Sequence, residues 1–129
     1  MTVSMILSFF LIMCGASIII IWIMNLRKNP DIDLSAGFFR AREKDSKNLF
    51  WFHIVAEFFT GLLLIVSGII IISRNINSLP IVHFALGALF YSSLNSLGWA
   101  FAYRERYFYA TPMTIGLVIS LVSIIIMIA

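Results

Sequence analysis

The sequence predicts an all-α fold, an integral membrane four-helix bundle with both chain ends on the outer side of the membrane. Of its 129 residues, 61% are hydrophobic and only 12% are charged. A water-soluble domain has about 45–50% apolar and about 25% charged residues, so this composition argues strongly against one. Disorder is excluded because disordered chains are poor in aromatic and β-branched residues. The length fits a single transmembrane domain over residues 1–129.

Four apolar runs define the predicted membrane spans. A helix needs roughly 20 mostly apolar residues to cross the hydrocarbon core, and about 18 still lies within the usual range. Helices are favoured over barrel strands because a membrane strand has only about 10 residues and alternates in polarity. The expected spans cover residues 3–24, 49–72, 80–103 and 112–129.

Turn and cap residues separate these runs. Asn29-Pro30 interrupts the chain after the first span, and the polar segment 75–80 forms a short turn before the third. Thr111-Pro112 is typical of a helix cap followed by proline at the first helical position. The first run is longer than a signal peptide core and lacks a basic start, so it is expected to stay as a membrane anchor.

The segment 25–48 is expected to be a cytoplasmic amphipathic connector between the first and second spans. Ser35 is a candidate cap for a helix within it, and Phe38 and Phe39 would then face the membrane or a neighbouring protein. Two interpretations remain open, namely a plain connector and an element that docks a partner or gates a passage.

The basic residues predict the orientation. Eight of the nine Lys and Arg residues lie in the two segments that follow the first and third spans, and only Arg74 lies in the other loop. Cytoplasmic loops retain Lys and Arg, so both basic segments should be cytoplasmic and both termini outside. We expect location in the cell membrane, plasma or bacterial inner. The net charge of +3 reflects this topology and does not indicate nucleic-acid binding.

Glu57 is the informative residue because it is the only acid inside a predicted span. It lies about 6 Å from the midplane of the second span, at about 1.5 Å rise per residue. Acids within membranes are costly and usually face the bundle interior or a watery cavity. His53 precedes Glu57 by four residues, so the two side chains lie on one helix face and can touch.

The third span offers partners at a similar depth. Its middle is polar, and the chain there runs in the opposite direction to the second span. The candidate ion, proton or ligand site therefore comprises Glu57, His53, Tyr91, Asn95, Ser96 and Trp99. The alternative is structural, because polar residues commonly join membrane helices through interhelical hydrogen bonds.

The sequence contains no known enzyme signature, and no catalytic residue, metal ligand set or cofactor is expected. The two histidines begin different spans on opposite sides of the membrane, about 25 Å or more apart, so they cannot ligate one haem within a single molecule.

Two functions of different classes follow. The first is an oligomeric transporter or channel with a buried proton or cation site at Glu57. The second is a non-catalytic accessory or scaffold subunit whose polar residues are structural. The expected partners are the lipid bilayer and either further copies of the chain or another membrane protein. Binding of a lipid or other hydrophobic ligand between the helices is a third possibility.

Overall fold

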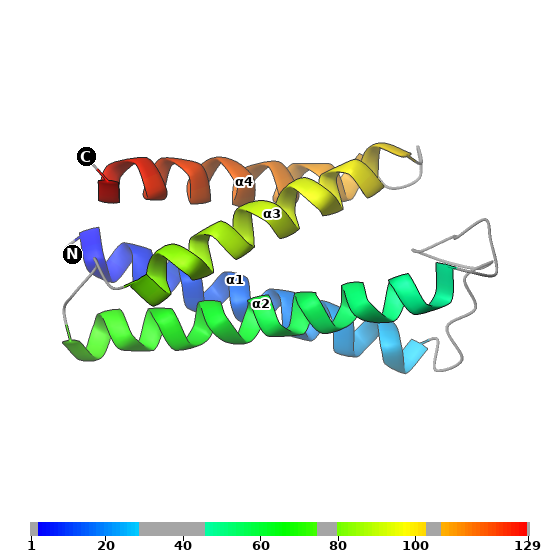
Figure 1. Ribbon diagram of the computed structural model, residues 1–129, viewed down its shortest axis with the longest axis horizontal. Helices are drawn as coiled ribbons and strands as arrows, with labels where there is room; N and C mark the ends of the chain where they lie inside the picture. Colours follow the sequence, from blue (N-terminus) through cyan, green and yellow to red (C-terminus); the bar gives the residue numbers. More distant parts are fainter. Residues whose placement is uncertain (1–2, 29–45, 75–79, 103–106, 129) are drawn as a thin grey trace.

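The computed structural model describes residues 3–28, 46–74, 80–102 and 107–128, and all of them are helical. The helices are α1 (Val3–Lys28), α2 (Ser46–Arg74), α3 (Pro80–Ala102) and α4 (Tyr107–Ile128). They form two antiparallel hairpins, α1–α2 and α3–α4, and α1 begins at the end of the molecule where α4 ends (Figure 1). The predicted all-α class is therefore confirmed.

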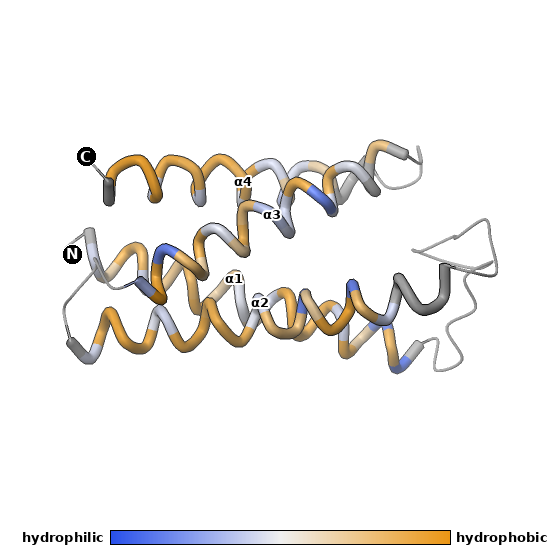
Figure 2. The backbone as a smooth tube through the Cα atoms, viewed as in Figure 1, coloured by the Kyte–Doolittle hydropathy of each residue, from blue (hydrophilic) through white to orange (hydrophobic). Residues whose placement is uncertain are grey.

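Three of these helices are long and apolar enough to cross a membrane. The qualifying segments are Ser4–Arg27, Trp51–Ser73 and Pro80–Gly98, whereas the apolar part of α4, Ala110–Ile126, is shorter. Hydrophobic residues dominate along all four helices (Figure 2). A small membrane protein is thus supported by the structure, while the fourth crossing and the outward orientation of both termini stay predictions.

The predicted start of the fourth helix was wrong. Thr111-Pro112 is not the helix start, because α4 begins at Tyr107 and contains Pro112. Pro112 is the sixth residue of α4, so it removes one intrahelical hydrogen bond just beyond the first turn. The apolar and aromatic residues before it still continue the helix. The cytoplasmic connector with Ser35, Phe38 and Phe39 lies outside the described residues.

The packing within each hairpin depends on small residues. In the α1–α2 hairpin, a Cβ atom added to Gly68 would lie 2.8 Å from the Ser8 carbonyl oxygen and 2.6 Å from Ile12 Cγ1. One added to Gly61 would lie 3.0 Å from the Gly15 carbonyl oxygen. In the α3–α4 hairpin, a Cβ atom added to Gly116 would lie 3.0 Å from the Ser93 hydroxyl oxygen. Small residues let membrane helices approach closely, and in the α1–α2 hairpin they bring backbone against backbone.

The two hairpins meet mainly where α2 packs on α3. Apolar side chains from both hairpins form the larger core cluster, towards the end of the molecule where α2 ends and α3 begins. Its buried members are Leu11, Leu64, Ile71, Val82, Ala85, Leu86 and Leu89. A smaller cluster of Trp22 and Ile54 lies towards the opposite end. Polar side chains fill the α2–α3 contact at the level of this smaller cluster.

Candidate functional site

One face of α2 carries polar and small residues, and the structure buries it against α1 and α3. Glu57 is 6% exposed, and Thr60 and Ser67 are buried on the same face. The spacing in the sequence predicts that His53 and Glu57 share one helix face, and the structure places their side chains together on this face. Glu57 is the only acidic residue in the part of the chain that the structure describes.

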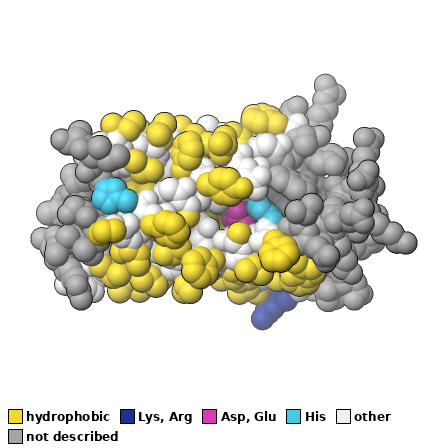
Figure 3. All heavy atoms as spheres, in the orientation of Figure 1, with side chains coloured by type: hydrophobic (Ala, Val, Ile, Leu, Met, Phe, Trp, Pro, Cys, Tyr) yellow, Lys and Arg dark blue, Asp and Glu magenta, His cyan; other side chains and the backbone are white. Residues whose placement is uncertain are grey.

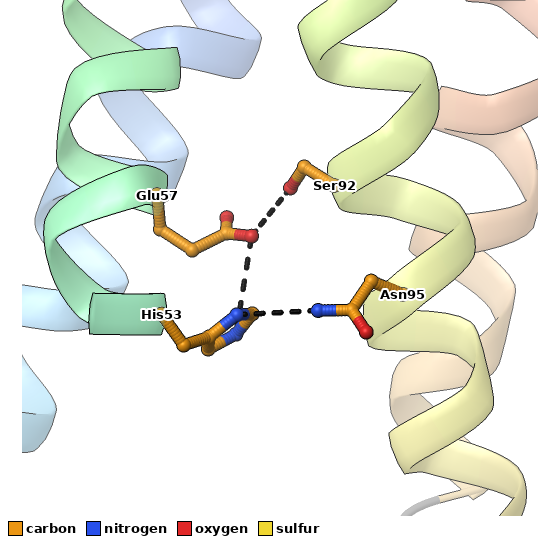
Figure 4. A network of polar contacts seen from close by, with 4 residues as sticks. All are labelled: His53, Glu57, Ser92 and Asn95. Atoms are coloured by element: carbon orange, nitrogen blue, oxygen red, sulfur yellow. Dashed lines mark hydrogen bonds and ion pairs between the residues drawn. The ribbon is translucent and has the colours of Figure 1, made fainter. Parts of the chain in front are cut away.

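The Glu57 carboxyl group is held by a hydroxyl from the other hairpin. Ser92 Oγ on α3 donates a hydrogen bond to Glu57 Oε1 at 2.6 Å (Figure 4). Such a length is typical of a hydroxyl bonded to an ionised carboxylate. This contact gives Glu57 a polar partner in surroundings where an isolated charge is costly.

His53 makes the second contact between the hairpins, one helical turn along α2. Asn95 Nδ2 lies 3.2 Å from His53 Nδ1. An amide nitrogen can only donate, so Nδ1 accepts this bond and a neutral His53 carries its hydrogen on Nε2. Nε2 faces Glu57 and lies 3.9 Å from Oε1. We call these four residues, His53, Glu57, Ser92 and Asn95, the polar seam (Figure 4).

The distance between Nε2 and Oε1 decides what the pair can do chemically. At 3.9 Å the two atoms lie beyond hydrogen-bond range, which is about 2.7–3.2 Å. A small side-chain rotation would close the gap, and a proton could then pass between imidazole and carboxylate. A protonated His53 would also form an ion pair with Glu57 at the present distance.

An aromatic ring from α1 completes the surroundings of His53. Trp22 is buried, and its ring meets the imidazole edge-on, with the ring centroids 5.7 Å apart and an interplanar angle of 75°. Trp22 also packs in one apolar cluster with Ile54, with Phe58 against it. The site therefore draws on α1, α2 and α3, and the packed indole restricts the positions that the His53 ring can take.

The polar seam is not fully sealed. The side chains of His53 and Glu57 are 16% and 8% exposed. Figure 3 shows an acidic side chain and a histidine next to each other on the surface between the hairpins, surrounded by hydrophobic side chains. The pair therefore has limited access to the outside of the chain at membrane depth.

Three predicted site residues meet in the structure, namely Glu57, His53 and Asn95. Tyr91 does not join them, because its side chain is 71% exposed and has no hydrogen bond to the described residues. Ser96 is half-buried and has no hydrogen bond in the described part of the chain. Trp99 belongs to α3, but its side chain lies outside the described residues.

Sequence reasoning omitted Ser92 and Trp22 from the site. Ser92 could have been found, because it lies three residues before Asn95 and Glu57 lies four after His53. In antiparallel helices these spacings place Glu57 opposite Ser92 when His53 faces Asn95. The structure pairs Glu57 with Ser92 and His53 with Asn95 in two parallel contacts.

The described residues provide few side chains that could ligate a metal ion. They contain no group of three or more His, Cys, Asp or Glu side chains that could hold one. The polar seam supplies one carboxylate, one imidazole, one hydroxyl and one amide. These groups suit a proton or a weakly held monovalent cation better than a transition metal.

Fold and site together define a small helical protein with apolar, span-length helices and one buried carboxylate between two helical hairpins. The chain belongs to a family described as Domain of unknown function (DUF8058), whose profile matches residues 1–129. No curated protein and no solved structure shows a significant match to the chain.

Proposed function

We propose that this protein is an oligomeric transporter or channel of the cell membrane, with a proton or cation site at Glu57. The observation that carries the proposal is the contact of Glu57 with Ser92 and His53 at the junction of the two hairpins. Carboxylates within membrane spans are rare, and they commonly mark ion pathways and proton relays.

The chemistry of the polar seam supports this role. Glu57 binds the proton or cation, and the Ser92 hydroxyl stabilises the carboxylate when the site is empty. His53 lies one turn nearer the start of α2, on the side that the basic loops assign to the cytoplasm. It passes protons to and from Glu57, and Asn95 keeps its Nε2 turned toward the carboxylate.

The placement of the seam supports a transport mechanism. Occupancy of Glu57 changes the charge at the main contact between the hairpins, and that change alters how strongly α2 holds α3. Binding at Glu57 would in this way open or close the contact between α2 and α3, and a bound ion would be exposed first to one side of the membrane and then to the other. The protein is proposed to act by binding and movement and not as an enzyme.

The other candidate function is an accessory or scaffold subunit. It is favoured by the fact that Glu57 and His53 each have a hydrogen-bonding or ionic partner within the chain. Interhelical polar contacts of this kind stabilise membrane helices by about 0.6 kcal/mol on average. The two functions differ in what Glu57→Gln does, because a structural residue tolerates an amide of the same shape.

Ion flux into liposomes tests the proposal. Purified protein is reconstituted with an entrapped pH dye, and a potassium gradient with valinomycin drives protons inward. Parallel vesicles carry dyes for sodium and potassium. We expect flux above that of protein-free vesicles, and we expect Glu57→Gln to lower it about tenfold or more, because the amide cannot take up a proton.

His83→Gln is the matched control. His83 lies on α3 near the opposite end of the molecule and is half-buried, so its replacement should keep at least half of the flux. Folding of each variant is checked by its unfolding midpoint. Absence of proton, sodium and potassium flux in the wild type, or full flux in Glu57→Gln, contradicts the proposal and favours the accessory subunit.

A further inference from the structure

The outward face of α3 differs from the other surfaces of the molecule. Its residues follow the alternating three- and four-residue spacing of a helix contact stripe. All are exposed in the structure, and we call them the α3 stripe: Phe84, Gly87, Tyr91, Leu94 and Gly98. The stripe is about 21 Å long at 1.5 Å per residue, which covers most of the hydrocarbon thickness of about 30 Å.

Two glycines on this stripe have nothing against them. A Cβ atom added to Gly87 or Gly98 would meet no atom within 4 Å. The other four glycines within the described helices, namely Gly15, Gly61, Gly68 and Gly116, each lie against a neighbouring helix. In this chain a helical glycine thus marks a close helix contact, except along the α3 stripe.

Tyr91 gives an independent reason to expect a partner. It is the middle residue of α3 (Pro80–Ala102), it is 71% exposed, and it has no hydrogen bond to the described residues. The Thr114 hydroxyl donates a hydrogen bond to the Ala110 carbonyl oxygen of its own helix. A tyrosine hydroxyl lies too far from its own backbone to make such a bond. Either membrane interface is about 15 Å from the middle of a span, and an unsatisfied polar group in lipid is costly.

We propose that the α3 stripe is the contact surface of a homodimer, in which α3 of one copy packs parallel to α3 of a second. The dyad runs along the membrane normal, because the basic loops impose one orientation on every copy. In such a contact each position meets itself, so Tyr91 faces the partner's Tyr91 at the same depth. Each phenol hydroxyl can donate and accept, so the pair is self-complementary.

The polar seam favours a second copy over lipid at this surface. Asn95 follows Tyr91 by four residues, a rotation of about 40° around the helix axis, so the seam, which is partly open at His53 and Glu57, adjoins the stripe at Asn95. The exposed fractions of His53 and Glu57, 16% and 8%, would fall when a second copy covers that opening. The dimer thus shields two polar groups from lipid and leaves the intrachain contacts unchanged.

Cross-linking in native membranes tests the contact. The only cysteine, Cys14, is first changed in Cys14→Ala, and Tyr91→Cys is added. Oxidation with copper phenanthroline should yield a covalent dimer. Val118→Cys on α4, also exposed, is the matched control and should stay monomeric. Equal cross-linking of the two variants contradicts the proposal.

Gly87→Leu tests whether the two α3 helices approach closely in the dimer. It should not disturb the packing of the monomer, because no atom lies within 4 Å of an added Cβ atom. We expect dimer dissociation in lipid, measured by energy transfer between labelled copies, to become about tenfold or more easier. The unfolding midpoint of the monomer, measured in dilute micelles, should not change. Tyr91→Phe should weaken association about threefold. A wild type that is monomeric in lipid, or Gly87→Leu copies that associate normally, would overturn the homodimer and leave the stripe to lipid or another protein.

This proposal does not depend on transport. The assays measure association and not flux, and Glu57→Gln is expected to dimerise like the wild type. A protein that dimerises without flux would reject transport and leave the homodimer. A monomer with flux would reject the homodimer and the oligomeric state of the proposed transporter, but would leave the ion site at Glu57.

Discussion

The contact inside the first hairpin and the contact between the hairpins are built in different ways. Along α1 and α2, glycines bring backbone against backbone, as at Gly68 and Ser8. Between α2 and α3, side-chain hydrogen bonds from Glu57 and His53 cross a less extensive contact. The first kind of contact has no freedom to adjust, because any added atom collides. The second is made by side chains, whose rotations can lengthen or shorten it.

We propose that this difference separates the region that carries stability from the region that carries function. Close packing in lipid is driven by van der Waals contact and small residues, so the α1–α2 contact should carry most of the stability. The polar seam contributes less, because polar contacts between membrane helices have modest net energies. The polar seam contains the only acidic residue among those described and contributes little to stability. It is therefore better suited to a conformational change than the α1–α2 contact.

The largest effect is expected at the glycine contact. Gly68→Ala places a Cβ atom 2.8 Å from the Ser8 carbonyl oxygen, so the helices must separate and the free energy of unfolding should fall by about 1–3 kcal/mol. Equilibrium unfolding in mixed micelles titrated with SDS measures it. Gly87→Ala, compared at a dilution where the protein is monomeric, is the control and should cause no loss, because no atom of the same chain lies within 4 Å of the added Cβ atom. Equal stabilities of Gly68→Ala and Gly87→Ala would contradict the claim that close glycine packing stabilises the α1–α2 hairpin.

A smaller effect is expected where the hydroxyl meets the carboxyl group. Ser92→Ala leaves Glu57 without its hydrogen bond at 2.6 Å, which should cost about 1–2 kcal/mol of unfolding free energy. The neighbouring Ser93 is also buried but has no hydrogen bond in the described part of the chain, so Ser93→Ala should cost less than Ser92→Ala. The same SDS titration compares them, and a larger loss for Ser93→Ala would contradict the assigned partner.

The smallest effect is expected for the contact of His53 with Asn95. A double-mutant cycle with His53→Ala and Asn95→Ala should give a coupling free energy of about 0.5–1 kcal/mol. The pair of His83 and Asn95, which lie at different depths on α3, should give a coupling near zero. A cycle without coupling for His53 and Asn95 would remove that contact from the polar seam.

The sequence predicts the helices well and the contacts between them only in part. Long apolar runs determine the helices, and spacing alone identifies the buried face of α2 through His53 and Glu57. The rotation of α3 is not predicted by spacing, because packing on α4 through Ser93 and Gly116 also sets it. A rotation of about 40° between residues four apart is enough to turn Tyr91 outward while Asn95 stays in the seam. The start of α4 was missed because Pro112 resembles a first helical residue.

The most direct test of the account is infrared difference spectroscopy of the Glu57 carboxyl group in protein reconstituted in lipid. Glu57→Gln assigns the band, and steps of pH or additions of sodium and potassium probe the site. The account predicts a band, absent from Glu57→Gln, that changes when protons or cations are exchanged and shifts in Ser92→Ala. A carboxyl band that never responds, together with unchanged folding of Glu57→Gln, would contradict it and make Glu57 a structural residue.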